Sequence, residues 1–159
     1  YYLLRFGPLF DDADISIKRL EEVYNSDLAN NLGNLVSRVA RLCETSGLDF
    51  EKETQPLKFH KSITDTLKDF RVDCGLQNFF ETKIKETNNY IDKKQPWKLE
   101  GKKLKVVLIR LVKDLREIGF NLEPFLPQTS MKIKEQFKEG EIKSEAPLFP
   151  RIQNAPRTA

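Results

Sequence analysis

Apolar residues recur along this chain at steps of three and four, and no alternating strand pattern extends beyond a few residues. This spacing places apolar side chains on one face of a helix. Three long segments show it, with apolar positions at Leu28, Leu32, Leu35, Val39 and Leu42; at Leu76, Phe80, Ile84, Thr87 and Ile91; and at Leu104, Leu108, Leu111, Leu115 and Ile118. The pattern therefore predicts an all-α protein.

A few residues with special backbone or capping preferences predict where these helices begin and end. Ser16 suits the N-cap of a shorter helix that precedes the first long segment. Gly47 and Gly119 are expected to end the first and third segments, and Pro96 to end the second because it disfavours helical geometry at Gln95.

Two further segments are predicted to be helical. ITDTLKDF repeats the apolar spacing at Ile63, Leu67 and Phe70, and QTSMKIKEQF follows a proline, whose missing N–H costs nothing in a first helical turn. Helices with one apolar stripe each bury it by packing together, so we expect a bundle of four to five main helices. Residues 139–159 hold too many prolines for a helix. We expect an irregular tail in which LFPRI docks on the bundle and the last residues are disordered.

The length of 159 residues suits a single domain, 1–159, with one sizeable core. No apolar run approaches membrane-spanning length, so no membrane partner is expected. The first residues, YYLLRFGPLF, lack the features of a secretory signal and an initiator methionine, which suggests a piece cut from a longer chain. Cys43, Cys74 and His60 are too few for a zinc site or a disulfide framework. They fit buried thiols and a surface-loop histidine in a cytoplasmic protein.

The usual motifs of enzyme sites are missing from the sequence. It contains no GxxxxGK[ST], GxGxxG, HExxH or CxxC, and its acidic residues alternate with lysines as expected of ion pairs on solvated helix faces. We therefore expect no catalytic residue, no metal site and no cofactor in this chain.

Basic residues gather around the single tryptophan, although the formal net charge is only +3. The lysines between positions 83 and 105 are Lys83, Lys85, Lys93, Lys94, Lys98, Lys102, Lys103 and Lys105, and the acidic residues in or beside that span are Glu81, Glu86, Asp92 and Glu100. Such a cluster is either a solvated helix face or a surface that binds phosphates.

Trp97, placed directly after Pro96 at the expected end of a helix, has two interpretations. It either caps the bundle as a buried side chain, or offers a platform on which an unpaired base stacks. Asn34 and Arg38 raise a similar choice, because residues four apart are neighbours on a helix. They either form structural hydrogen bonds, or use their donors and acceptor to read the edge of a nucleobase.

Several stretches together resemble a known family. YNSDLANNLGNLVSRVARL, YIDKKQPWKL, EPFLPQTSMKIKEQF and APLFPRI occur in the order and approximate spacing of the anticodon-binding domain of bacterial-type methionyl-tRNA synthetase, a class I aminoacyl-tRNA synthetase. The opening YYLLR resembles the segment that joins this domain to the catalytic part, which would make residues 1–14 the junction. DLANNLGNL is shared more loosely with the synthetases for valine, isoleucine and leucine.

The resemblance implies a domain that receives the anticodon CAU of tRNA(Met). Trp97 matches the family tryptophan that stacks on the first anticodon base, and Asn34 and Arg38 match the pair that hydrogen-bonds that cytosine. Pro96 matches the proline that shapes the same pocket. Methionine activation with ATP and magnesium is implied for a separate catalytic domain of the same enzyme, which is a second expected partner.

The chain also departs from the family pattern. Glu100 and Gly101 follow PWKL where the family often has alanine and lysine, and the HIGH-type and KMSKS-type signatures and the zinc-binding insertion are absent. The chain alone is therefore not expected to form aminoacyl-tRNA. The alternative function is a non-catalytic helical domain for protein contact, with Trp97 buried as a cap, or the anticodon domain of a related class I synthetase.

Overall fold

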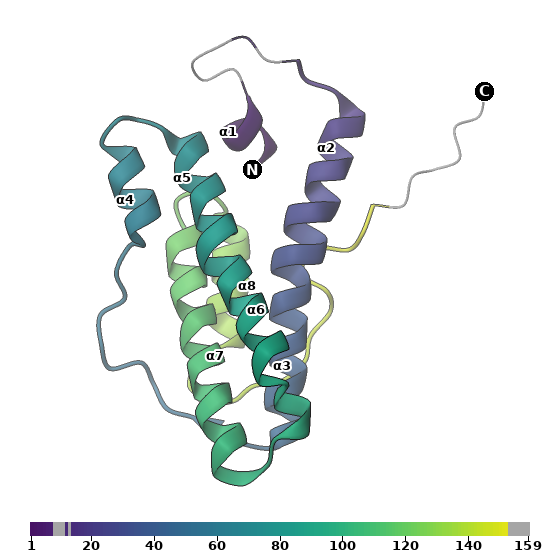
Figure 1. Cartoon of the computed structure of the whole chain (residues 1–159), viewed down its shortest axis with the longest axis vertical. Coiled ribbons are helices and arrows are strands. Elements are labelled where there is room, and N and C mark those ends of the chain that lie inside the picture. Colours follow the sequence, from purple (N-terminus) through teal and green to yellow (C-terminus); the bar gives the residue numbers. More distant parts are fainter. Residues whose placement is uncertain (8–11, 13, 153–159) are drawn as a thin grey trace, which may run out of the picture.

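A computed structural model describes residues 1–7, 12 and 14–152, and it is dominated by helices that run side by side along the molecule (Figure 1). The expected all-α class is confirmed. The elements are α1 (Tyr2–Phe6), α2 (Ile17–Val23), the π-helix η1 (Tyr24–Gly33), α3 (Asn34–Ser46), β1 (Asp49–Phe50), α4 (Lys61–Leu67), α5 (Val72–Phe79), the π-helix η2 (Phe80–Ile84), α6 (Lys85–Lys94), the 3₁₀ turn η3 (Pro96–Lys98), α7 (Gly101–Leu122), α8 (Pro127–Gln136) and β2 (Gly140–Glu141).

The first long helical rod joins α2, η1 and α3 without a break (Figure 1). Ser16 caps it as predicted, because its hydroxyl oxygen accepts the backbone N–H of Arg19 at 3.2 Å. Gly47, with a φ of 60°, ends it in the left-handed conformation that glycine adopts without strain. The separate short helix expected after Ser16 is thus the beginning of the same rod.

The second rod joins α5, η2 and α6 and carries a buried stripe that includes Ile84 and Ile91. It ends as predicted at Gln95, which adopts a φ of 45° before Pro96. The π-helical segments η1 and η2 occupy the middle of the two rods and contact each other. Periodicity alone did not predict these wider turns.

The third rod, α7, continues to Leu122, so the expected end near Gly119 is wrong. Gly119 lies where α8 comes close to α7. A Cβ at this position would be 3.0 Å from the Cγ2 of Ile133, and the buried hydroxyl of Ser130 donates to the Gly119 carbonyl at 2.7 Å. The glycine therefore permits close packing of two helices and does not end one.

The rods share one buried core, and most of the predicted stripe positions belong to it. Its largest fully buried side chains are Phe79, Phe80, Phe137, Leu32, Leu35, Ile63, Leu76, Ile84, Ile91, Leu108, Leu111 and Leu115. Two predicted apolar positions are exceptions, because Leu67 is exposed and Phe70, 80% exposed, follows the end of α4. His60 is not a loose loop residue, since its Nδ1 accepts the Ser62 N–H and caps α4.

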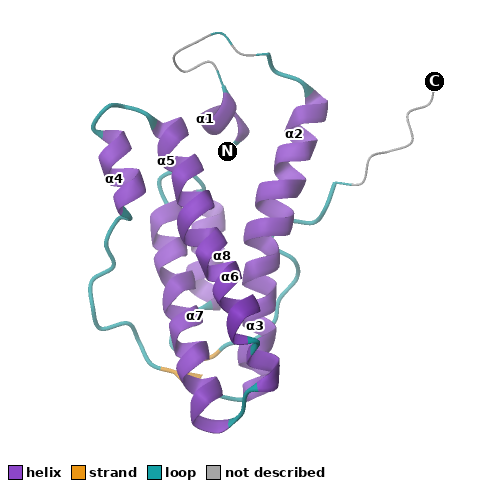
Figure 2. Ribbon diagram, viewed as in Figure 1, coloured by secondary structure: helices purple, strands orange, loops and turns teal. Residues whose placement is uncertain are grey.

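The C-terminal tail is irregular apart from β2, which pairs antiparallel with β1 at one end of the bundle (Figure 2). The docking expected of LFPRI is present. The rings of Phe149 and Tyr24 meet edge to face at 6.0 Å, and the side-chain amide of Asn25 both donates to and accepts from the Ile152 backbone at 3.0 Å. The expectation of disorder concerns residues 153–159, which lie outside the described residues.

The N-terminal helix α1 packs against α5. The Tyr1 hydroxyl donates to Asp27 Oδ2 at 2.8 Å, and Arg5 also pairs with that carboxylate. These contacts attach the first residues to the bundle. The assignment of residues 1–14 as a junction stays a prediction, and residues 8–11 and 13 of that segment lie outside the described part.

Candidate nucleic-acid interface

Trp97 lies on a tight turn whose backbone is fixed while its indole is exposed. Pro96 is buried and begins the turn, and two backbone bonds close it, from Lys98 N–H to Gln95 O at 2.8 Å and from Leu99 N–H to Pro96 O at 3.0 Å. The Trp97 side chain is 54% exposed. Leaving about half of a tryptophan in water forgoes about 2–3 kcal/mol of burial. A buried cap role for Trp97 is therefore wrong.

Arg38 and Asn34 lie one turn apart on the polar flank of α3, beside buried Leu35 and Val39. Arg38 Nη2 donates to Asp92 Oδ1 at 2.7 Å, and Asp92 belongs to the last two turns of α6, five residues before Trp97. The contact holds the Arg38 guanidinium against α6, the helix that comes directly before the turn with Trp97.

A second polar contact joins the same two rods. The side-chain amide of Asn88 on α6 donates to Asn31 Oδ1 at 3.0 Å. Asn31 and Arg38 thus both face α6, where their partners Asn88 and Asp92 lie one turn apart, and Asn34 lies between them in the chain. The polar flank of α3 thus borders α6, which the turn η3 with Trp97 follows.

Asn34 itself lines a hollow of about 240 Å³ whose other wall is the C-terminal tail. Pro147, Phe149 and Pro150 form that wall, and neither Arg38 nor Trp97 is among the lining residues. The predicted residues therefore lie on adjoining elements, and Asn34 does not share this hollow with Arg38 or Trp97. The tail was missed as part of this surface, because only its general docking could be inferred from the apolar LFPRI.

One lysine of the basic cluster predicted around Trp97, Lys83, is buried and does not belong to an exposed basic surface. Lys83 is 9% exposed and donates to Asp114 at 2.8 Å and to Glu117 at 2.5 Å, while Arg110 Nε donates to the other oxygen of Asp114 at 2.9 Å. Burial lowers the pKa of Lys83, but the hydrogen bonds to the two carboxylates outweigh it and leave that pKa above its ordinary value. Lys83 is thus a structural cation.

Buried Asp114 also corrects the view that the carboxylates of this chain lie on solvated faces. The lysines closest to the tryptophan in sequence, Lys93, Lys94, Lys98, Lys102 and Lys103, are all exposed. They can meet a phosphate without first losing a buried partner.

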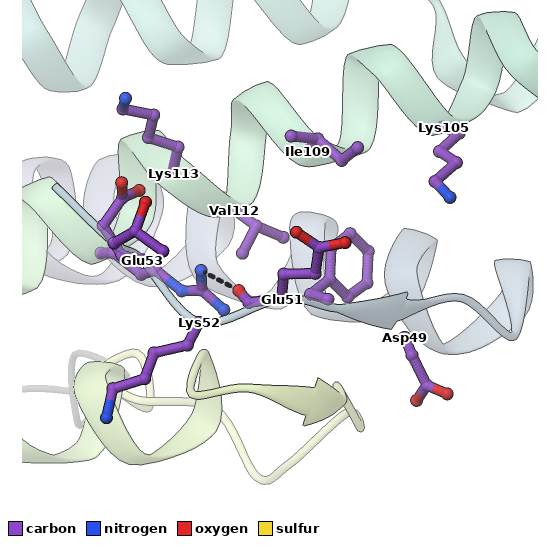
Figure 3. A pocket seen from close by; sticks show the side chains of 11 residues that line it. Asp49, Glu51, Lys52, Glu53, Lys105, Ile109, Val112 and Lys113 are labelled. Atoms are coloured by element: carbon purple, nitrogen blue, oxygen red, sulfur yellow. Dashed lines mark hydrogen bonds between the residues drawn. The ribbon is translucent and has the colours of Figure 1, made fainter.

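Another pocket, of about 320 Å³, lies between β1 and the middle of α7 (Figure 3). Arg116 is one of its lining residues and donates to the carbonyls of Glu51 at 2.7 Å, Phe137 at 2.7 Å and Lys138 at 3.1 Å. Burial lowers the pKa of Arg116. The remaining lining mixes acidic and basic side chains, so this pocket carries no single sign of charge. The hydrogen bonds of Arg116 mainly connect the chain next to β1 and the end of α8 to α7.

No other type of site is present among the residues that the structure describes. In this part of the chain no three His, Cys, Asp or Glu side chains are grouped so as to hold a metal ion, and no helix is long and apolar enough to cross a membrane.

Comparison with known proteins decides the family. The family described as tRNA synthetases class I (M) matches residues 1–40. The methionine–tRNA ligase of Clostridium acetobutylicum is 36% identical over 86% of the chain, and that of Fusobacterium nucleatum is 31% identical over 96%. The chain is a methionyl-tRNA synthetase-derived domain. It spans only 24% and 30% of the lengths of these two relatives.

Solved structures support the fold of this synthetase-derived domain. The free methionyl-tRNA synthetase of Mycobacterium tuberculosis superposes with a TM-score of 0.75 at 21% identity, covering 98% of this chain and 38% of that one. The same enzyme in complex with methionyl-adenylate gives a TM-score of 0.74. The expected helical architecture of a synthetase domain is thus confirmed.

Proposed function

We propose that this domain reads the anticodon CAU of tRNA(Met) for a methionyl-tRNA synthetase. The observation that carries the proposal is the exposed indole of Trp97, held on a rigid turn at the end of the helix that Arg38 contacts from α3. An exposed, pre-positioned aromatic ring among lysines is typical of surfaces that stack single-stranded bases.

Each residue has a distinct role in this proposal. Trp97 stacks on the cytosine at the first anticodon position and contributes about 1–3 kcal/mol, and buried Pro96 holds the ring in place. Arg38 and Asn34 discriminate the base through its polar edge. Asp92 accepts from Nη2 of Arg38 and orients the guanidinium, and among the described contacts its other N–H groups have no protein acceptor.

The aminoacylation belongs to the proposal for the whole enzyme. A catalytic part outside this chain would activate methionine with ATP and magnesium, as the methionyl-adenylate complex of the Mycobacterium tuberculosis enzyme suggests. The present domain would position the tRNA for that reaction in the cytoplasm. Its own residues supply recognition only.

The single tryptophan allows a direct test, because all tryptophan fluorescence comes from Trp97. We expect an RNA hairpin with CAU in its loop to quench this fluorescence, and a hairpin with UAU to do so only at much higher concentration. Equal quenching by both hairpins would contradict base reading. An indole that neither RNA perturbs would favour the alternative, a domain for protein contact.

A further inference from the structure

A groove with four lysines lies beside Trp97, between the end of α6 and the beginning of α7. Lys93 and Lys94 project from α6, Lys102 and Lys103 from the first turn of α7, and the volume is about 490 Å³. The remaining lining residues are Tyr90, Leu99, Val106 and Val107, so the lining contains no carboxylate. This lysine groove therefore combines an apolar floor with a rim of one charge sign.

The lysines of the groove are not neutralised by the protein. Within the described residues none of the four has an ion pair, and Lys94 only lies 5.8 Å from the Tyr90 ring centroid. The nearby carboxylate of Asp92 is occupied by Arg38. The rim thus presents about four positive charges to solvent.

Two features of the lysine groove are energetically unfavourable when no ligand is bound. Lys102 and Lys103 lie in the first turn of α7, where the helix dipole is positive and which itself contains no acidic residue. The N-cap residue, Glu100, supplies a single negative charge beside this turn but makes no side-chain hydrogen bond to it. An exposed valine, Val106, adds apolar surface to the floor. Both unfavourable features would be relieved by a ligand that is anionic on one side and apolar on the other.

We propose that the lysine groove binds the RNA strand that continues from the base stacked on Trp97. Phosphates would lie on the lysines, and a ribose or base would cover Tyr90, Leu99 and Val106. Continuity favours RNA over an acidic peptide, because Leu99 of the floor is two residues after Trp97, so one strand can reach both surfaces. This inference rests on the proposed function and extends its footprint to a groove that α6, Leu99 and α7 line and α3 does not.

The test compares a CAU trinucleotide with a single-stranded nonamer that has CAU at its centre, using Trp97 fluorescence. The variant is Lys102→Gln/Lys103→Gln. The matched control is Lys61→Gln/Lys132→Gln, which removes the same charge from exposed sites on α4 and α8. All four side chains are exposed, and circular dichroism is to be used to check that both variants fold.

We expect the nonamer to bind more tightly than the trinucleotide. The groove variant should lose most of that gain, and the slope of log affinity against log salt should fall by about 1.4, or about 0.7 per phosphate contact. The trinucleotide should bind the groove variant and the control alike.

A groove variant that loses no more nonamer affinity than the control would overturn the inference. So would an acidic peptide that displaces the nonamer from the groove without reversing trinucleotide quenching, because the groove would then serve a protein. Failure of the CAU trinucleotide to quench Trp97 more than a UAU trinucleotide would instead overturn the proposed function.

Discussion

Substitution of Arg38 by alanine separates base reading from folding, because the structure gives the two effects different sizes. The Arg38 and Asp92 side chains are 30% and 64% exposed. An ion pair this exposed stabilises a protein by about 0–1 kcal/mol, so Arg38→Ala should lower Tm by at most about 4 °C. Loss of good hydrogen bonds to one base is larger, about 1–3 kcal/mol.

The expected functional result is a loss of selectivity. Titrations of Trp97 fluorescence with the CAU and UAU hairpins should show their affinity ratio falling by about 5- to 150-fold, since every 1.4 kcal/mol is tenfold. Binding of the UAU hairpin should change little, because stacking and phosphate contacts remain.

Asp92→Asn is the control for the ion pair. It removes the negative charge of the ion pair but keeps a side-chain oxygen that can accept from the Arg38 guanidinium. Hairpin selectivity should therefore persist, with slightly tighter binding of both RNAs because one negative charge is lost. The reasoning is refuted if Arg38→Ala weakens both hairpins equally, or if Asp92→Asn abolishes selectivity as fully as Arg38→Ala does.

Three further predictions concern stability and charge. Lys83→Ala should lower the free energy of unfolding by about 1–3 kcal/mol in urea titrations because buried Asp114 keeps only Arg110 as a partner and Glu117 loses its own, whereas exposed Lys85→Ala should change it by no more than about 0.5 kcal/mol. Burial raises the pKa of the Cys43 thiol to about 12, so a disulfide reagent at pH 8 should label only half-buried Cys74 until denaturant is added; rapid labelling of both would contradict the buried position. Lys94→Ala should weaken all hairpins alike and reduce the salt slope by about 0.7, and an unchanged slope would mark that lysine as a solvated surface residue.

The fold was largely predictable because helical stripes are local patterns. The caps at Ser16 and Gly47 and the turn at Pro96 depend on nearby residues and lie where the sequence predicts them. Gly119 and Phe70 did not follow the prediction, because their surroundings are decided by the approach of α8 and by the end of α4.

The candidate site was predictable only in part. The place of Trp97 after a proline at a helix end was predictable, but its exposure was only one of two interpretations that the sequence allowed. The choice of Asp92 as the partner of Arg38 depends on how two distant segments align. The burial of Lys83 likewise depends on α7, because its partner Asp114 on that helix is 31 residues away in the sequence. Such long-range pairings leave no mark in residue spacing.

The wide turns of η1 and η2 determine in which direction around the helix axis the side chains of the following helices, α3 and α6, point. Both lie immediately before the helices that carry Arg38 and Asp92, and one residue corresponds to about 100° of helical rotation. Losing a single residue from either segment would swing the downstream side chains by more than a quarter circle and separate the guanidinium from its carboxylate. The proposed base reading would then be lost through a deletion outside the residues assigned to it, with Trp97, Asn34 and Arg38 all still in the chain.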